Sequence, residues 1–262
     1  MSNICFCIPA RYESTRLSCK LLLKLGEESC IRKTIKQVMK SKSFNNNIFI
    51  FTDSVHIKEE IEDLPCNIIM TNGNYRNGSE RISKNLNLIN NQYNIIINVQ
   101  ADEPYISHKN IDYCIENHLK NNTNNLFYTT LHEETNSAEY LKSTASLKLI
   151  VDNDNNVLYY SRNIIPWNKN NKIVDSYNYK TFTGIYVYNR NMLEIYGKMN
   201  DTPLQLMEDC EQLKILENGY KIKSFPTVEY NEISLNTIED YNFLKKNMYK
   251  KVKYYIYLYY NV

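Results

Sequence analysis

The stretch IIINVQADEP occupies residues 95–104, and its apolar run ends abruptly in two adjacent carboxylates and a proline. A strand that is apolar on both faces is typical of the middle of a parallel sheet, where an unpaired carboxylate would be costly to desolvate. Asp102 and Glu103 are therefore expected at the carboxyl end of the strand, where open α/β sheets bind their ligands. The alternative role for either acid is to cap the following helix or turn.

The segments before this strand alternate between short apolar runs and longer amphipathic ones. Strands are expected at 3–9, 47–53, 66–71 and 94–100, and helices near 29–41, 54–63, 79–91 and 108–120. This alternation predicts βαβ units and a mostly parallel central sheet, which makes the chain an α/β protein.

The order of expected elements changes after about residue 125, where strands follow one another with fewer helices between them. The expected strands are 126–133, 146–152, 157–162 and 182–189, and one helix is expected around 204–217, between Pro203 and Gly219. This half is predicted to be a smaller region of mixed or antiparallel strands. Because no repeat or Pro/Gly-rich linker separates the halves, we treat residues 1–262 as one domain.

The composition is that of an ordinary globular protein, with 43% hydrophobic and 23% charged residues among 262. A formal net charge of +2 gives no reason to expect a nucleic-acid partner. Lysines crowd the segment 245–253, but a solvated helix face explains them more simply. We therefore expect no nucleic-acid partner.

The cysteines and the first residues indicate the cellular compartment in which the protein is expected. Seven cysteines without a C-x-x-C pair predict neither a disulfide framework nor a zinc site, and fit a reducing cytoplasm. The first residues lack the features of a secretory signal, and no window approaches the ~18 apolar residues of a membrane span. We expect a cytoplasmic protein that does not bind a membrane. The aromatic run at 254–260 is interpreted as a closing strand or a subunit contact.

Several familiar active-site motifs are missing. The sequence has no G-x-S-x-G and no G-x-G-x-x-G, which argues against a serine hydrolase elbow and a dinucleotide fingerprint. Gly73 and Gly78 have the spacing of a phosphate-binding loop, but Ser79 and Glu80 follow where Lys and Ser/Thr are required.

The loop PARYESTRLSCK (9–20) follows the first expected strand and carries Arg11, Arg16 and Lys20 against one acid, Glu13. Three cations and free backbone N–H groups can hold a triphosphate and offset the charge that develops as a phosphoryl bond breaks. An ordinary solvated loop remains the alternative.

Two more polar loops follow later strands. NGNYRNGSER (72–81) contains two glycines that permit a close approach to a ligand, with Arg81 one turn into the next helix; a plain connection is the alternative. Asp102 is suited to hold a divalent cation, because magnesium sites commonly use one or two carboxylates plus substrate oxygens and waters.

Seven segments resemble, in order and spacing, the motifs of the 3-deoxy-manno-octulosonate (Kdo) cytidylyltransferases. They are IPARYESTRL, FTD, MTNGNYRNGSER, NVQADEP, LYYSRNIIPW, GIYVY and CEQLKILENGYKI. The resemblance covers residues 3 to 245. It implies a Rossmann-like (GT-A-like) nucleotidyltransferase fold and a magnesium-dependent homodimer. It also implies that the chain makes CMP-Kdo, a precursor of lipopolysaccharide and other surface glycans, from CTP and Kdo, with release of pyrophosphate.

The resemblance also assigns roles, with residues 1–125 mainly binding nucleotide and 126–262 mainly binding sugar and forming the dimer. Nucleotide-binding positions are Pro9, Ala10, Arg11, Arg16, Lys20, Thr71, Asn77, Gly78, Ser79 and Arg81. Catalytic positions are Arg11, Lys20 and Asp102, and metal-binding positions are Asp102 and Asn236. Sugar-binding positions are Gln100, Arg162, Tyr186, Glu211 and Gln212.

Some of these sugar-side roles have alternatives. Arg162 is the expected partner of the sugar carboxylate through a paired guanidinium contact. Tyr186 lies in an apolar strand and has a core role as its alternative, and Glu211 on its helix has a solvent-facing one.

The chain departs from the family pattern at four places. Ser18-Cys19 replace Pro-Gly before Lys20, Ala101 replaces a glycine, Phe182 a histidine and Asn236 an aspartate. If the backbone at Cys19 needs a positive φ, the cysteine costs ~1–2 kcal/mol. These departures leave two alternatives to Kdo activation. One is a cytidylyltransferase for another acidic sugar, such as an amino-Kdo or a nonulosonic acid; the other is a catalytically weak homologue that binds nucleotide.

Overall fold

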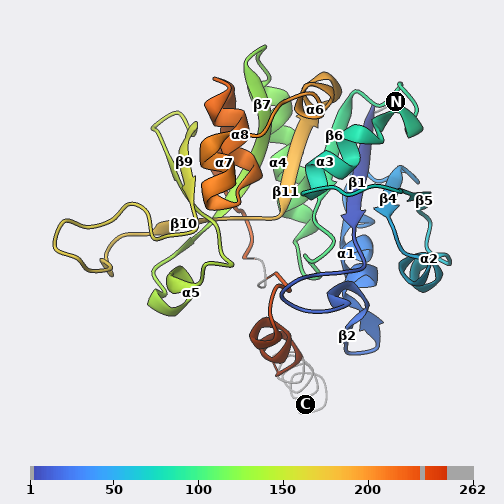
Figure 1. Cartoon of the computed structure of the whole chain (residues 1–262), viewed down its shortest axis with the longest axis horizontal. Coiled ribbons are helices and arrows are strands. Elements are labelled where there is room, and N and C mark those ends of the chain that lie inside the picture. The colour runs from blue at the N-terminus through green and yellow to red at the C-terminus, as the bar shows by residue number, and fades with distance from the viewer. Residues whose placement is uncertain (1–2, 231–233, 247–262) are drawn as a thin grey trace, which may run out of the picture.

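A single ten-stranded sheet runs through the computed structural model, which describes residues 3–230 and 234–246 (Figure 1). The strand order is β5-β4-β1-β6-β11-β7-β10-β8-β9, and β12 pairs with β7. The strands are β1 (Ile4–Ala10), β4 (Ile48–Thr52), β5 (Asn67–Met70), β6 (Ile95–Val99), β7 (Leu126–Thr135), β8 (Lys148–Val151), β9 (Val157–Ser161), β10 (Tyr179–Phe182), β11 (Ile185–Asn189) and β12 (Lys221–Pro226). A separate hairpin joins β2 (Lys24–Leu25) to β3 (Glu28–Ser29).

The predicted parallel and mixed strands belong to this one sheet. β5, β4, β1 and β6 are parallel to one another. β11 runs antiparallel to β6, and the successive strands from β11 to β9 are antiparallel to one another, whereas β12 is parallel to β7. The mixed region therefore extends the sheet instead of forming a separate layer.

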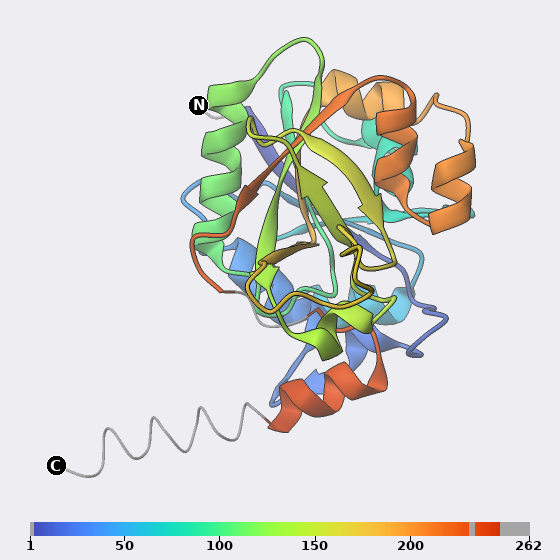
Figure 2. The same cartoon turned by 90° about the vertical axis from the view of Figure 1, so that its left-hand side faces the viewer.

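The helices cover both faces of the sheet. They are α1 (Cys30–Val38), α2 (Val55–Ile61), α3 (Gly78–Lys84), α4 (His108–Asn121), α5 (Ala138–Lys142), α6 (Arg190–Tyr196), α7 (Pro203–Glu208) and α8 (Glu211–Glu217), with 3-10 turns η1 (Lys20–Leu22) and η2 (Leu86–Leu88). A further helical stretch covers 238–246. Figure 2 shows α4 and α8 on opposite sides of the sheet.

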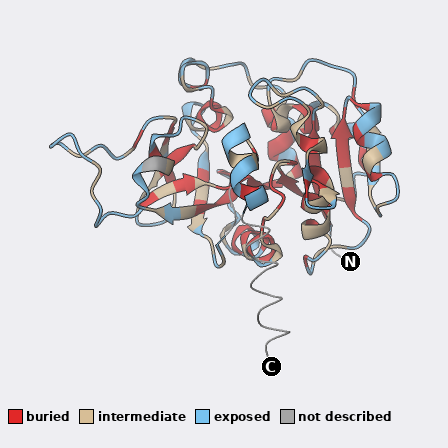
Figure 3. Ribbon diagram, turned by 90° about the horizontal axis from the view of Figure 1, so that it is seen from below, coloured by how far each residue is buried: buried red, intermediate tan, exposed pale blue. Residues whose placement is uncertain are grey.

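Residues of β1 alternate between two cores, as the period of two in a strand requires. Phe6 and Ile8 belong to the core that α1, α2 and α4 complete, whereas Cys5 and Cys7 face α3, α6 and α8. The buried residues fill the sheet and the inner helix faces, and the exposed ones lie outside (Figure 3). Cys5 and Cys7 are thus small core residues, and all seven cysteines are free thiols.

Three expected elements are wrong in their extent. The helix expected near 79–91 ends at Lys84 and is followed by the 3-10 turn η2. The helix expected at 204–217 is two helices, because Asp209 takes a left-handed conformation (φ 46°, ψ 55°) between α7 and α8. The strand expected at 182–189 is split at Thr183–Gly184, where Gly184 lies against the Glu103 carboxyl and its carbonyl accepts from the N–H of Gln100.

The predictions about a membrane span and about the C-terminal segment concern residues that the structure describes only in part. Within 3–230 and 234–246, no helix is long and apolar enough to cross a membrane. The aromatic run at 254–260 and most of the lysine-rich segment at 245–253 lie outside the described residues.

Candidate active site

A cavity of about 900 Å³ opens along the carboxyl ends of β1 and β6 and continues under α7 and α8. Most of the sequence-predicted site residues line it: Pro9, Arg11, Arg16, Lys20, Asn77, Gly78, Arg81, Gln100, Asp102, Arg162, Tyr186, Glu211, Gln212 and Asn236. Ala10, Thr71 and Ser79 do not line it and are buried. The fold therefore brings cations from the first loop and polar groups from the second half to one cavity.

The centre of the cavity is a cluster of opposite charges. The Lys20 ammonium pairs with the Asp102 carboxylate, and their side chains are 11% and 19% exposed. Asn236 Oδ1 accepts from Lys20 Nζ at 3.5 Å and from Arg16 Nη2 at 3.3 Å. The N–H of Leu235 donates to the Asp102 carbonyl at 2.9 Å, so the segment from 234 onward is attached directly to the acid turn.

The two acids of the opening motif point in different directions. Both acids line the cavity, but Asp102 pairs with Lys20, whereas Glu103 is buried and accepts a hydrogen bond from Ser234 Oγ at 2.6 Å. Burial, followed by the nearby Asp102 charge, raises the pKa of Glu103 to about 8. Neither acid caps α4, because Ser107 is the N-cap residue of that helix. Asp102 is the more exposed of the two and lies beside Lys20, and Glu103 joins the turn to the segment that carries Asn236.

A second acid, Asp53, joins two sides of the cavity. Its Oδ1 accepts from the backbone N–H of Tyr12 at 2.9 Å, and its Oδ2 accepts from Arg81 Nη2 at 2.7 Å. Burial raises the pKa of Asp53, but the bonds from Arg81 and Tyr12 outweigh it and the net effect is to lower that pKa. Asp53 thereby fixes both the start of the cationic loop and the Arg81 guanidinium. Asp53 is the aspartate of the FTD motif in the sequence. The motif alone did not indicate what this aspartate does.

The nucleotide-side positions that do not line the cavity support those that do. Thr71 Oγ1 accepts from Arg81 Nη1 at 2.7 Å, and Ser79 Oγ donates to Glu211 Oε1 at 3.2 Å. Asn77 caps α3 by accepting from the N–H of Glu80. Direct nucleotide contact by Ala10, Thr71 and Ser79 stays a prediction.

The opposite end of the cavity is aromatic and polar. Tyr186 is 3% exposed and belongs to the core, yet it also lines the cavity and accepts from Gln212 Nε2 at 3.0 Å. Glu211 faces this cavity and not bulk solvent, and loss of water contact raises the pKa of its carboxyl. Phe182 packs on Tyr186 with ring centroids 5.1 Å apart and gives this end an apolar wall.

Arg162 lies at the same end, but its guanidinium is bonded to backbone carbonyls. It donates to the carbonyls of Thr144 (3.3 Å), Ala145 (3.4 Å), Glu208 (3.2 Å) and Asp209 (2.8 Å). A guanidinium has five N–H donors, so a paired contact with a carboxylate requires some of these bonds to break. The bonds to Asp209 and Glu208 also hold the break between α7 and α8.

Lys148 lies behind this end, fully buried on β8. Burial, then the nearby Arg162 charge, lowers the pKa of its ammonium to about 8. Its sequence context gives no signal of this role, because a lysine among the apolar residues of SLKLIVD resembles a solvent-facing position in an alternating strand.

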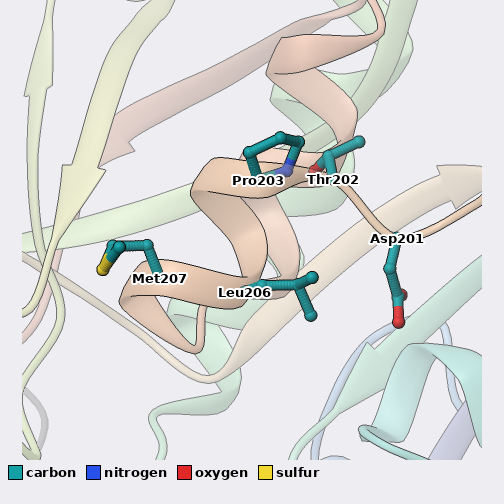
Figure 4. A pocket seen from close by; sticks show the side chains of 5 residues that line it. All are labelled: Asp201, Thr202, Pro203, Leu206 and Met207. Atoms are coloured by element: carbon teal, nitrogen blue, oxygen red, sulfur yellow. The ribbon is translucent and has the colours of Figure 1, made fainter.

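A second hollow of about 530 Å³ lies on the outside of α7 and is lined by Asp201, Thr202, Pro203, Leu206 and Met207. Figure 4 shows Leu206 and Met207 projecting from this helix. Asp201 forms an ion pair with Arg76 at 3.2 Å. This surface is largely apolar and does not offer the charged groups that phosphoryl chemistry requires.

The residue before Lys20 carries backbone strain. Cys19 has φ 49° and ψ 30°, the left-handed region, which confirms the positive φ considered at this position. Cys19→Gly is expected to raise the free energy of unfolding by about 1 kcal/mol, because the left-handed region penalises a Cβ and glycine's greater freedom in the unfolded chain offsets only part of the gain. Urea unfolding measures the difference. Cys19→Ala keeps the Cβ and serves as the control; equal stability of the two variants would contradict the strain.

Comparison with known proteins identifies the family to which the chain is related. A family described as cytidylyltransferase matches residues 5–222. The 3-deoxy-manno-octulosonate cytidylyltransferase of Fusobacterium nucleatum is 34% identical over 247 residues, which cover 93% of this chain and 97% of that protein. The chain belongs to the Kdo cytidylyltransferase family. The family member from Zea mays is 35% identical over 216 residues, 82% of this chain and 71% of its own.

A solved structure agrees with the fold predicted for this family. It is that of CMP:2-keto-3-deoxy-manno-octonic acid synthetase complexed with CTP, with a TM-score of 0.84 and 24% identity. The match covers 95% of this chain and 100% of that one. The nucleotidyltransferase fold is thus confirmed. The family match and the relatives at 34–35% identity show that this family member is a nucleotidyltransferase enzyme.

Proposed function

We propose that this chain transfers CMP from CTP to Kdo, giving CMP-Kdo and pyrophosphate. The observation that carries the proposal is the single cavity, with Arg11, Arg16, Lys20 and Asp102 at one end and Gln212, Tyr186 and Glu211 at the other. The names of the relatives supply the two substrates. A triphosphate fits the cationic end, and a hydroxyl-rich sugar acid fits the polar and aromatic end.

In this reaction the anomeric hydroxyl oxygen of the sugar acid bonds to the α-phosphorus as the bond to the pyrophosphate oxygen breaks, and the hydroxyl proton is lost to water. Negative charge grows on the leaving pyrophosphate. Lys20, Arg16 and Arg11 line the end that would receive it, and fixed cations there lower the barrier without reorganising. None of the four histidines, all of them in the described part of the chain, lines the cavity. Positioning and charge are therefore the means of catalysis we propose.

We propose magnesium as the cofactor. Among residues 3–230 and 234–246, no group of three His, Cys, Asp or Glu side chains could hold a metal by itself. Asp102 and Asn236 offer a carboxylate and an amide oxygen beside Lys20, a hard donor pair that fits a cation completed by phosphate oxygens and water. Bound there, magnesium would neutralise phosphate charge. Asn236 brings no charge of its own, so we expect weaker binding than a second carboxylate would give.

The lining of the cavity constrains the identity of the sugar less than that of the nucleotide. Phe182 presents an aromatic ring to the cavity next to Tyr186. An apolar ring offers no hydrogen-bond partner to a sugar hydroxyl at that point. A related acidic sugar is therefore the second candidate substrate.

The test is pyrophosphate release from CTP and magnesium with Kdo, an amino-Kdo and a nonulosonic acid, each repeated with a chelator. The proposal expects release with Kdo that stops on chelation. Release only with another sugar would identify the second candidate. CTP binding without release from any sugar would identify a catalytically weak homologue, and release that survives chelation would remove magnesium from the proposal.

We also infer a homodimer that acts in the cytoplasm. α7 leaves Leu204, Leu206 and Met207 exposed, Met207 to 84%, and clustered apolar side chains on a surface are typical of subunit contacts. Sedimentation velocity is expected to give twice the chain mass of 31.1 kDa, and Met207→Glu to shift the protein toward a monomer. A wild-type monomer at assay concentrations would contradict the dimer. The seven free thiols support a reducing compartment.

A further inference from the structure

Two cations hold the sugar end of the cavity together through backbone carbonyls. We infer that Lys148 is a positioning residue for the sugar acid: it holds the loop 143–146 and Arg162 in the arrangement that shapes this end of the cavity. This inference rests on the proposed function for the identity of the ligand. The contacts themselves do not depend on it.

Every donor of the Lys148 ammonium is used. Nζ donates to the carbonyls of Ser143 (2.7 Å), Ser146 (2.8 Å) and Arg162 (2.7 Å). A buried ammonium is costly unless its hydrogen bonds are satisfied, and an ammonium has three donors. An apolar side chain could fill this strand position without the cost of burying a charge. Stability alone therefore does not explain a lysine here.

Arg162 completes the arrangement from the other side. It donates to Thr144 and Ala145, so each of the four carbonyls from 143 to 146 accepts a bond from one of the two cations. Its other bonds reach Glu208 and Asp209, at the break before α8. The Glu208 carboxylate supplies negative charge, accepting from Ser161 Oγ and from the backbone N–H of Arg162, both at 2.8 Å.

The bonded backbone is the wall of the cavity. Ser143, Ala145 and Ser146 line it from the loop, and Asp209 lines it from the break that leads into Glu211 and Gln212. The three hydrogen bonds of the Lys148 ammonium lie in the second half of the chain, away from Lys20 and Asp102. Losing the ammonium should therefore loosen the sugar end and leave the cationic end unchanged.

The kinetic test is Lys148→Met, which keeps the length of the side chain and removes its donors. KM for the sugar acid is expected to rise about ten- to hundredfold, since small misplacements of binding groups have effects of that size, while KM for CTP changes less than twofold. Lys148→Arg, which can donate to the same carbonyls, is expected to recover part of the loss. Lys142→Met is the matched control, because Lys142 is exposed on the neighbouring α5. A folded Lys148→Met enzyme with an unchanged sugar KM, or with both KM values raised equally, would overturn the inference.

A second measurement does not require activity. Amide hydrogen exchange in the peptide spanning 143–146 is expected to accelerate in Lys148→Met and not in Lys142→Met. If Lys148→Met does not fold, Lys148→Gln gives the same comparison, because its amide keeps two N–H donors in place of three. Unchanged exchange would overturn the positioning role even if the enzyme uses no tested sugar. Faster exchange in a protein that activates none would leave the role standing and reject the proposed function.

Discussion

Asp102→Asn is expected to lower kcat for pyrophosphate release by about 10²–10³-fold, the size of effect seen when one preorganised charge-stabilising group is removed. The carboxylate pairs with Lys20 at the centre of the cavity and is the only carboxylate proposed to hold magnesium. Asparagine keeps the shape and an acceptor oxygen but loses the negative charge. The fold should survive, because the bond from the Leu235 N–H goes to the Asp102 main chain.

The measurement is kcat at a series of magnesium concentrations, together with the thermal midpoint of the same samples. Asp175→Asn is the control, since it removes one carboxylate from an exposed residue outside the cavity. The variant should need more magnesium for half-maximal activity. Activity within a few-fold of wild type, at an unchanged magnesium midpoint, would remove Asp102 from the proposed metal site.

Periodicity predicts the sheet well and its interruptions poorly. The strand at 95–99 was recognisable because its residues are apolar on both faces, a requirement set by helices on both sides of the sheet. The break at Asp209 was not, because the bonds that hold it come from Arg162, distant in sequence. The split at Gly184 likewise depends on Glu103, which packs there from the carboxyl end of another strand.

The cavity could be anticipated where residues follow strands directly. Arg11 and Asp102 come just after neighbouring parallel strands, whose carboxyl ends meet at one edge of a sheet. Chain order alone does not place Asn236, which returns to Lys20 through contacts of Leu235 and Ser234 with the acid turn. Nor does it separate Asp102 from Glu103, because both follow the same strand and only packing decides which one is buried.

Lys20→Met is expected to reduce kcat by about 10²–10³-fold, for a reason that complements the Asp102 prediction. The ammonium pairs with Asp102 and also donates to Asn236, at the end of the cavity proposed for the phosphates. Without it, charge on the departing pyrophosphate loses a fixed partner, and the partly buried Asp102 carboxylate loses its counter-ion. The second effect should also reduce stability by about 1–3 kcal/mol, since an acceptor is left unsatisfied.

Lys24→Met provides the matched control, because Lys24 belongs to the adjoining hairpin, pairs with Glu60 and is 54% exposed. Lys20→Arg separates charge from geometry: a guanidinium keeps the positive charge but not the compact ammonium, so partial activity is expected. The measurements are single-turnover pyrophosphate release and urea unfolding. If Lys20→Met loses stability but keeps its single-turnover rate, the lysine only neutralises Asp102, and phosphate stabilisation must come from Arg11 and Arg16. If the rate falls and Lys20→Arg restores part of it, the charge itself acts on the leaving group.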